Sequence, residues 1–237
     1  MKSLRILLTG GSSGIGAATA QALTAAGHRV TILARNEAAL ASVAELCPAE
    51  SIRYQIVDVT NEHDVKLAVD AAIAQWGGID ACIPNAGLGI FEPLKTAELS
   101  DWKKMVDVNI GGVLNTLHAC LPSLIENKGH VVQIGSIAAR NVFPNSGIYC
   151  ATKHAVLAIS ESLRIEFRDE LAVTTINPGA VDTTFIDQTK DDELRENYRP
   201  QFEQGMQPSF IAEAIAFAVS SGGKGVFSEI TMRPDRR

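Results

Sequence analysis

The chain has 237 residues, of which 46% are hydrophobic and 20% are charged, and its formal net charge is -6. This composition is typical of a globular protein with a large core and argues against intrinsic disorder. Because acidic residues outnumber basic ones, no cationic surplus neutralises a phosphate backbone, and nucleic acid is not an expected partner.

Strand and helix patterns alternate along the first third of the chain. A short apolar run over 5–9 ends in a glycine-rich turn, and a helix is predicted over 16–26. Further strands are predicted over 30–34, 52–57 and 81–84, and further helices over 37–46 and 62–75.

The same alternation continues through the middle of the chain. It predicts a long helical region over 100–125, a strand over 130–134, a helix over 149–170 and a strand over 172–176. Strands separated by helices need crossover connections, which build a parallel sheet with helices on both faces. We therefore expect an α/β fold, a doubly wound, Rossmann-like parallel sheet, formed by residues 1–237 as a single domain.

The alternation is interrupted over 183–208. This segment is rich in charged residues and contains the isolated aromatic residues Phe185, Tyr198 and Phe202. Because ligands of open α/β sheets bind at the carboxyl ends of strands, the segment is predicted to be a substrate lid, poorly ordered without ligand. An exposed helical excursion is the alternative.

The turn after the first strand reads Thr9-Gly10-Gly11-Ser12-Ser13-Gly14-Ile15-Gly16. Glycines allow the backbone to approach a pyrophosphate, whose charge is met by free N–H groups and the positive end of the helix. The turn therefore indicates dinucleotide binding, although glycines can also serve a tight turn alone.

The end of the second strand, Ala34-Arg35-Asn36, indicates which dinucleotide is bound. An NAD enzyme places an acid roughly 20 residues past the glycine turn, to bind the ribose hydroxyls. Arg35 stands there instead, and a guanidinium binds the 2′-phosphate of NADP, with Ser12 or Ser13 adding neutral hydrogen bonds. NADP(H) is the expected cofactor.

Tyr149 and Lys153 are four residues apart on a predicted helix, which places both on one face. Hydride transfer to a carbonyl leaves a developing alkoxide that needs a proton donor. We expect the ammonium to lower the pKa of the tyrosine toward the working pH. Taken singly, each residue has an ordinary structural alternative, a packed tyrosine or a solvated lysine.

Other kinds of site are not expected. The four cysteines form no C-x-x-C pair and the five histidines show no metal-ligand spacing, so no metal is proposed. No uninterrupted apolar run reaches the roughly 18 residues that span a bilayer, and no signal-peptide core is seen, so a cytoplasmic protein without a membrane partner is expected.

Motifs in order along nearly the whole chain resemble the short-chain dehydrogenase/reductase family. They are T-G-x-x-x-G-x-G at the first turn, Asn85-Ala86-Gly87, Asn109, Ser136, Tyr149-x-x-x-Lys153 and Pro178-Gly179-x-Val181-x-Thr183. Pro84 and Gly135 depart from the family pattern, where asparagine and serine are frequent. The ending over 229–234 looks more like the short 3-hydroxy-acid and clavulanate dehydrogenase branch.

The resemblance implies a role for each matching residue. Tyr149 would be the acid/base, Lys153 would also orient the nicotinamide ribose, Ser136 would bind the substrate oxygen, and Asn109 would hold a water of a proton relay. The other residues expected to bind the cofactor are Gly10, Ser12, Ser13, Gly14, Ile15, Gly16, Arg35, Asp58, Asn85, Ala86, Gly87, Pro178, Gly179, Val181 and Thr183. The family also implies a homotetramer or homodimer.

The expected function is interconversion of a small carbonyl (ketone, aldehyde or 3-oxo acid) and its alcohol by an NADP-dependent enzyme. A nucleotide-sugar epimerase or dehydratase is one alternative, disfavoured because only about 60 residues follow Pro178, too few for a substrate domain. A non-catalytic dinucleotide sensor is the other, disfavoured because Tyr149 and Lys153 are both present. The substrate pocket is expected from 138–143, Gly179 and the lid. Arg140 there either grips a carboxylate or, as we favour, faces water.

Overall fold

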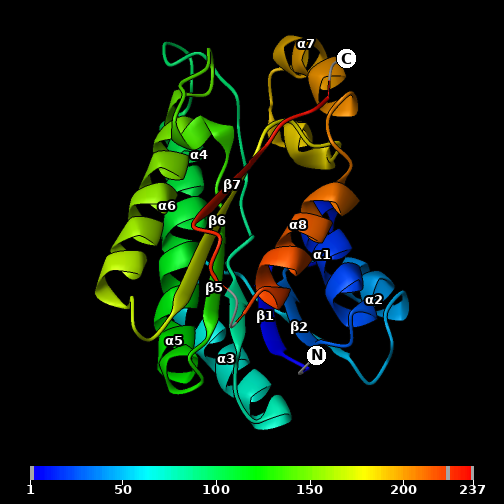
Figure 1. Ribbon diagram of the computed structural model, residues 1–237. Coiled ribbons are helices and arrows are strands. Elements are labelled where there is room, and N and C mark those ends of the chain that lie inside the picture. The colour runs from blue at the N-terminus through cyan, green and yellow to red at the C-terminus, as the bar shows by residue number, and fades with distance from the viewer. Residues whose placement is uncertain (1–2, 223–224, 236–237) are drawn as a thin grey trace.

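The computed structural model describes residues 3–222 and 225–235, and its strands form one parallel sheet in the order β3-β2-β1-β4-β5-β6-β7. This confirms the expected doubly wound α/β fold (Figure 1). The strands are β1 (Arg5–Thr9), β2 (Arg29–Ala34), β3 (Ile52–Ile56), β4 (Ala81–Ile83), β5 (His130–Ile134), β6 (Ala172–Pro178) and β7 (Glu229–Met232).

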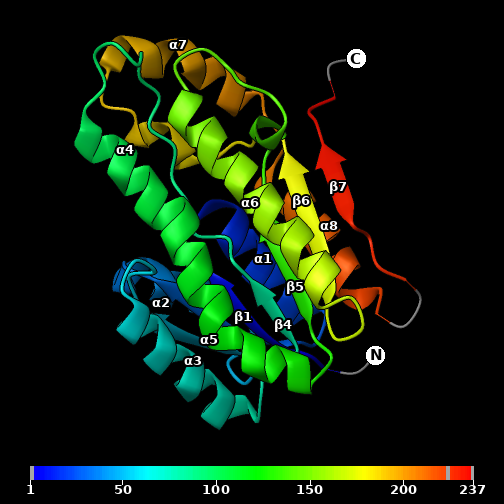
Figure 2. The ribbon, with the colours of Figure 1, turned by 90° about the vertical axis from the view of Figure 1, so that its left-hand side faces the viewer.

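Helices cover both faces of the sheet (Figures 1 and 2). One face packs against α1 (Gly14–Ala25), α2 (Glu37–Glu45) and α8 (Pro208–Ser220). The other face packs against α3 (Glu62–Trp76), α5 (Gly112–Glu126) and α6 (Gly147–Glu166). The remaining helical elements are α4 (Leu99–Val106), a π-helical turn η1 (Asp107–Gly111), 3-10 turns η2 (Ile137–Ala139) and η3 (Thr184–Gln188), and α7 (Asp192–Glu203).

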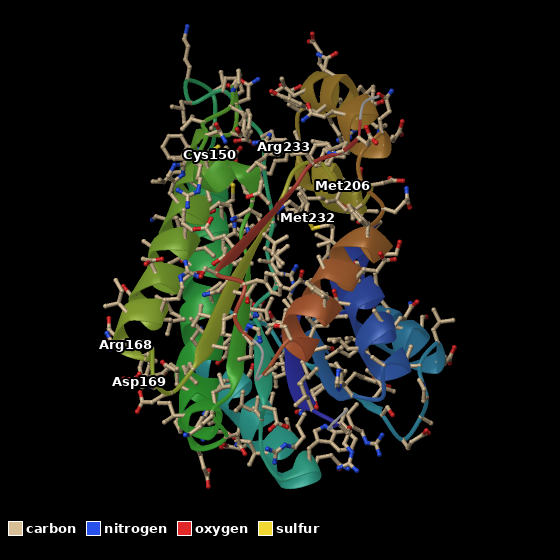
Figure 3. All side chains as sticks on the ribbon, in the orientation of Figure 1. Cys150, Arg168, Asp169, Met206, Met232 and Arg233 are labelled. Atoms are coloured by element: carbon tan, nitrogen blue, oxygen red, sulfur yellow. The ribbon has the colours of Figure 1, made fainter. Side chains whose placement is uncertain are left out.

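The central strands are apolar on both faces because both faces are covered. Leu7 and Leu8 are neighbours on β1 and are both fully buried, yet each lies in a different core cluster, one on either side of the sheet. Alternation of side chains along a strand produces this arrangement, and it explains why the central strands read as continuous apolar runs. Met206 and Met232, which lie near each other in Figure 3, join the core on the α8 side.

Polar residues set the helix boundaries close to where they were predicted. The side chains of Asn36 and Asn61 cap α2 and α3 by accepting hydrogen bonds from first-turn N–H groups. Gly77 ends α3 in the left-handed conformation, with φ of 81°. The other boundaries in the first third of the chain also differ by no more than two residues from the predicted ranges.

The middle and the end of the chain differ from the sequence prediction. The helical region predicted over 100–125 is divided by the π-helical turn η1, and the helix predicted over 149–170 is α6, which ends at Glu166. The chain turns there because the buried Leu171 must lead into β6, and its N–H bonds to the carbonyl of Phe167. The helix α8 and the edge strand β7 were not predicted.

The run Leu99–Glu126 comprises α4, η1 and α5 and contains an 18-residue window with a mean hydropathy of 1.3, which is long and apolar enough to cross a membrane. Half of this window is buried within the protein, where α5 packs against α3 and the sheet. The run is therefore a core helix of the fold. The sequence criterion missed it because polar residues interrupt the apolar ones.

Candidate active site

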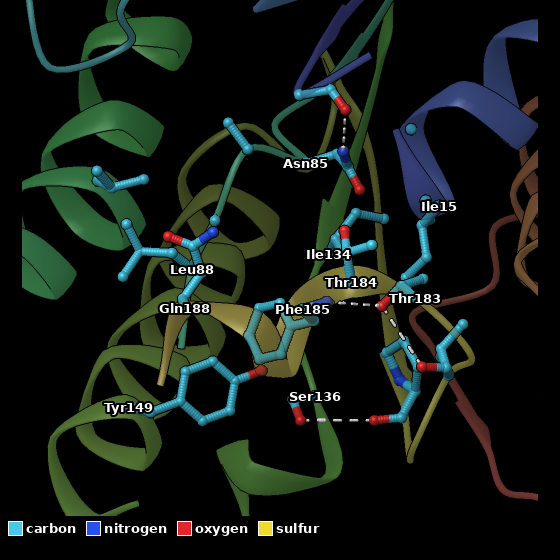
Figure 4. Close-up of a pocket in the computed structure, with 18 of the residues that line it drawn as sticks. Ile15, Asn85, Leu88, Ile134, Ser136, Tyr149, Thr183, Thr184, Phe185 and Gln188 are labelled. Atoms are coloured by element: carbon cyan, nitrogen blue, oxygen red, sulfur yellow. Dashed lines mark hydrogen bonds between the residues drawn. The ribbon is translucent and has the colours of Figure 1, made fainter. Parts of the chain in front are cut away.

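A pocket of about 480 Å³ opens at the carboxyl ends of the central strands, and Tyr198, Gln201 and Phe202 of α7 form part of its wall. All the residues expected to bind the cofactor lie on its wall, from the glycine turn and Arg35 at one end to Tyr149 and Lys153 at the other. Ser136 lies there too, whereas Asn109 does not. Figure 4 shows part of this wall, with the Tyr149 hydroxyl directed toward Ser136 and the ring of Phe185 beside it.

The glycine turn has the shape that a diphosphate group requires. Gly10 and Gly14 have φ of +69° and +50°, and a Cβ on Gly16 would lie 2.0 Å from the carbonyl oxygen of Gly10. Ser13, the residue before α1, makes no side-chain capping bond. The first-turn N–H groups of α1 therefore have no side-chain acceptor among the described residues and lie at the pocket wall, as an anionic ligand needs.

Hydrogen bonds fix the loop after β4 against this turn. The amide Nδ2 of Asn85 donates to the carbonyls of Thr9 (2.9 Å) and Gly10 (3.2 Å), as Figure 4 shows in part. In return the Thr9 hydroxyl accepts from the N–H groups of Asn85 (3.1 Å) and Ala86 (3.0 Å). Asn85 is thus placed to shape the pocket. The role of Thr9 in holding this loop was not predicted from the sequence, because the two partners lie 76 residues apart.

Arg35 and Asp58 occupy the opposite end of the pocket from Tyr149. The Arg35 guanidinium lies 3.9 Å from the Asp58 carboxylate, and the two side chains are 65% and 41% exposed. Burial opposes the ionisation of Asp58, but hydrogen bonds from Thr60 and the charge of Arg35 outweigh it and lower the pKa of the carboxyl. The weak ion pair leaves the donors of Arg35 accessible to a phosphate.

Lys153 is buried and directed to the end of β5. Its ammonium donates to the carbonyl oxygen of Ile134 at 2.9 Å, and its Nζ lies 5.9 Å from the ring centroid of Tyr149. The side chain is 7% exposed, and burial lowers its pKa to about 8. Lys153 therefore contacts both the strand end and the tyrosine ring.

The pKa of Tyr149 differs from the sequence expectation. Burial raises it to about 12, while the interaction with the Ser136 hydroxyl acts in the opposite direction. We expected Lys153 to lower this pKa, but the ammonium lies over the ring, and loss of hydration has the larger effect. At neutral pH the tyrosine therefore carries its proton.

Ser136 follows β5 at the pocket wall, and its hydroxyl makes only one short hydrogen bond to the residues that the structure describes. Its hydroxyl oxygen accepts from the N–H of Ala138 at 3.1 Å, and its donated bond to the carbonyl of Pro178 is long, at 3.5 Å (Figure 4). A hydroxyl with a weak partner can donate to a ligand oxygen instead.

Asn109 lies behind the pocket wall in the π-helical turn and is 1% exposed. Its amide nitrogen donates to the carbonyl of Leu88 (2.8 Å) and the hydroxyl of Thr152 (3.0 Å), and its oxygen accepts from the N–H of Leu88 (2.9 Å). Both amide hydrogens are thus used by protein groups. The geometry makes Asn109 a positioning residue that joins the loop after β4 to α6.

The segment 183–208 supplies three rings to the pocket wall, those of Phe185, Tyr198 and Phe202. It folds into η3 and α7, and none of the residues of α7 is buried. Thr189 accepts a bond from the N–H of Phe91 at 3.1 Å, Lys190 pairs with Asp101 at 2.6 Å, and the Tyr198 hydroxyl donates to the carbonyl of Pro144 at 3.1 Å, so these contacts join the segment to the rest of the protein. The sequence identified these aromatic residues as isolated in a charged segment, but it did not predict that all three side chains line the pocket.

Arg140 does not line the pocket. Its guanidinium pairs with Glu229 at 2.7 Å, and its side chain is 61% exposed. This agrees with the interpretation that Arg140 faces water. Of the range 138–143 the pocket wall contains only Ala138 and Phe143.

The described residues contain no group of three or more His, Cys, Asp or Glu side chains placed to hold a metal ion. All four cysteines are free and buried.

Known proteins resemble this chain over nearly its full length. An uncharacterised oxidoreductase of Staphylococcus saprophyticus subsp. saprophyticus is 33% identical, over 99% of this chain and 97% of the relative. An alcohol dehydrogenase of Thermococcus sibiricus, solved with 5-hydroxy-NADP, is 28% identical with a TM-score of 0.88, over 100% of this chain and 98% of that one.

Two further solved structures are similar. A serine dehydrogenase solved with NADP+ is 28% identical with a TM-score of 0.89, over 97% of this chain and 94% of that one. The 3-ketoacyl-(acyl-carrier-protein) reductase of Brucella melitensis, solved with NADH, is 27% identical with a TM-score of 0.87, over 98% and 97% of the two chains. These neighbours hold NADP, an NADP derivative or NADH.

The model of the short chain dehydrogenase family matches residues 5–194, which include the glycine turn, Ser136, Tyr149 and Lys153. With a relative at 33% identity over 99% of the chain, this match settles the family. The chain belongs to the short-chain dehydrogenases, and it is an oxidoreductase of small molecules that depends on a nicotinamide dinucleotide.

Proposed function

We propose that the enzyme uses NADP(H) to interconvert a small ketone, aldehyde or 3-oxo acid and its alcohol, with Tyr149 as the general acid/base. The observation that carries this proposal is the continuity of the pocket. One cavity contains the glycine turn and Arg35 at one end and Ser136, Tyr149 and Lys153 at the other. A dinucleotide bound along it would extend from a phosphate site to a proton donor.

The residues of the chain divide the work of the reaction. NADPH, when bound, supplies the hydride that the carbonyl carbon accepts. Tyr149 holds the proton for the carbonyl oxygen at its hydroxyl, and Ser136 donates a hydrogen bond to the same oxygen. Lys153 holds a positive charge beside the tyrosine ring and is placed to bind the nicotinamide ribose, while Asn109 positions the loop after β4.

The raised pKa of Tyr149, about 12, favours the direction of carbonyl reduction. A tyrosine that keeps its proton at neutral pH is a competent acid and a poor base. Alcohol oxidation, which needs the phenolate, should therefore require a higher pH.

The remaining features of the proposal follow from the family and the sequence. Residues 1–237 form one dinucleotide-binding and catalytic domain, and 183–208 closes over the substrate as a lid. The protein is cytoplasmic and assembles as a homotetramer or homodimer. The serine dehydrogenase neighbour supports kinship with the short 3-hydroxy-acid dehydrogenase branch, and the lining of the pocket decides the substrate.

Cofactor-coupled profiling tests the proposal. A panel of ketones, aldehydes and 3-oxo acids is offered with NADPH and with NADH, and cofactor oxidation is followed by absorbance. The Tyr149→Phe variant should lose about 10²- to 10⁴-fold in kcat and keep its affinity for NADPH, because the hydroxyl supplies a proton and no phosphate contact. A variant that kept more than about a tenth of the wild-type rate would show that another group is the acid.

A further inference from the structure

Five aromatic rings, including that of Tyr149, pack on one another at the substrate end of the pocket. The ring of Phe91 lies at their centre, with centroid distances of 5.9 Å to Tyr149, 6.3 Å to Phe185, 5.5 Å to Tyr198 and 6.2 Å to Phe202. Phe185 also contacts Tyr149 at 5.5 Å. We call these five residues the aromatic cluster, and all of them line the pocket.

The cluster joins three parts of the chain that are far apart in sequence. Phe91 comes from the loop after β4, Tyr149 from α6, and the other three rings from η3 and α7. The lid contributes three rings and the uncharged polar residues Thr183, Thr184, Gln188 and Gln201 to the pocket wall. It contributes no charged side chain there, although the segment is rich in charged residues. Charged side chains of the segment are thus kept away from the substrate end.

Within the part of the chain that the structure describes, the charged residues of the pocket wall are Arg35, Asp58 and Lys153. Arg35 follows β2 and Ser136 follows β5. These two strands are three positions apart in the sheet, which separates them by about 14 Å. Lys153 is bound to the carbonyl of Ile134. The substrate end therefore has no guanidinium or ammonium placed to pair with a substrate carboxylate.

Gly89 allows two rings of the cluster to pack closely against the loop after β4. A Cβ on Gly89 would lie 2.6 Å from Cε1 of Phe185 and 3.4 Å from Cδ2 of Tyr149. The two rings therefore pack directly on the backbone of the loop after β4, and any side chain there would displace Phe185. This packing fixes the positions of the two rings, and the ring surfaces that line the pocket can meet a planar group of a ligand by stacking or by edge-to-face contact.

We infer that the substrate carries a neutral, planar apolar group, an aryl ring, close to its carbonyl, and that the aromatic cluster selects this group over a carboxylate. The inference rests on the proposed function, since it names the substrate class of the same site. An anionic 3-oxo acid would lose its hydration in the pocket without a paired cation, whereas an aryl ring would gain apolar contacts. Within the proposed range of carbonyl compounds, aryl-substituted ketones and aldehydes are the preferred members.

Matched ketones test the inference. 4-Phenylbutan-2-one and levulinate share the same methyl ketone and two-carbon spacer and differ in a phenyl group against a carboxylate. Methyl levulinate removes the charge alone, and 4-cyclohexylbutan-2-one replaces the planar ring by a saturated one. Dissociation constants are measured by calorimetry with the wild-type enzyme and NADP+, which forms a complex that cannot reduce a ketone, and kcat/KM is measured with NADPH.

The phenyl ketone should bind about 10-fold or more tightly than levulinate, because the pocket leaves a carboxylate unpaired. Methyl levulinate should lie between them, and the cyclohexyl ketone should bind more weakly than the phenyl ketone. Levulinate binding as tightly as the phenyl ketone would overturn the inference. If the phenyl ketone binds preferentially but no ketone is reduced with NADPH, the proposed reaction fails and the binding specificity stands.

Variants locate the selectivity in the cluster. Phe202→Leu should lower the ratio of kcat/KM for the phenyl ketone to that for the cyclohexyl ketone by about 2- to 10-fold. This is the effect expected when the phenyl group of the ketone loses its contact with one aromatic ring. Phe217→Leu is the matched control, because Phe217 is 60% exposed on α8 and does not line the pocket. An equal effect of the two substitutions on the ratio, or none from Phe202→Leu, would show that the rings do not select the substrate.

Discussion

Removal of the Arg35 guanidinium is expected to weaken NADPH binding and to leave NADH binding nearly unchanged. Arg35 is the cation at the carboxyl end of β2, at the end of the pocket away from Tyr149. The 2′-phosphate distinguishes the two cofactors, so a residue that binds this phosphate affects one of them alone.

The magnitude follows from the exposure of the side chain. A hydrogen bond between charged groups contributes about 1.5 to 3 kcal/mol. Arg35 is 65% exposed and also faces Asp58 at 3.9 Å, so water and the nearby carboxylate screen its charge. We discount the contribution to about 1 to 2 kcal/mol, which corresponds to a loss of about 5- to 30-fold in NADPH affinity.

The assay is a fluorescence titration of wild type, Arg35→Ala and Arg140→Ala with each cofactor. Arg140 is a matched control, because it is 61% exposed, is paired with Glu229 and lies outside the pocket. Adding Ala34→Asp to Arg35→Ala should further shift the preference toward NADH, since a carboxylate there repels the phosphate and accepts from ribose hydroxyls. Equal losses for both cofactors in Arg35→Ala, or an unchanged NADPH preference in the double variant, would refute the phosphate assignment.

Three further outcomes are expected. Above pH about 8, kcat/KM for NADPH should fall, because burial lowers the pKa of Lys153 to about 8 in the protein without cofactor and the side chain is neutral above that pH. A flat profile of kcat/KM for NADPH through this region would contradict that role. Lys190→Met should speed amide hydrogen exchange over 192–203 and raise the KM for the carbonyl substrate, because it removes the ion pairs with Glu98 and Asp101. Unchanged exchange would show that other contacts hold the lid. Gly16→Ala should lower the Tm and abolish cofactor binding, because the new Cβ would lie 2.0 Å from the carbonyl oxygen of Gly10. Gly111→Ala is the control and should keep the wild-type Tm, because the space around Gly111 is open. Equal melting curves for the two variants would argue against the tight turn.

Local signals were enough to predict the sheet and one end of the site. The apolar runs of β1 and β4 are continuous because both faces of the central sheet are covered, and glycine or asparagine marks several of the helix ends. Tyr149 and Lys153 are four residues apart, so helix geometry alone puts them on one face. The glycine turn can be recognised in the sequence because only glycine readily adopts the positive φ of Gly10 and Gly14.

Features that depend on distant contacts were not predictable in this way. The π-helical turn around Asn109 is stabilised by bonds to Leu88 and Thr152, which lie 21 and 43 residues away. β7 is a short edge strand whose pattern is set by pairing with β6, and α8 is apolar without a clear helical period. The rings of the lid point into the pocket because the segment folds back over the strand ends, which composition does not reveal.

Burial of the catalytic residues also has an electrostatic consequence that the spacing of Tyr149 and Lys153 did not indicate. The same loss of hydration raises the pKa of the tyrosine to about 12 and lowers that of the lysine to about 8, so each group shifts toward its neutral form. A nearby anionic ligand favours a protonated ammonium, so a dinucleotide bound along the pocket should oppose the shift of Lys153 and keep the side chain charged to a higher pH. That charge would stabilise the phenolate that remains once Tyr149 has given up its proton. Cofactor binding should therefore support proton transfer most strongly above pH about 8, where Lys153 without cofactor is largely neutral.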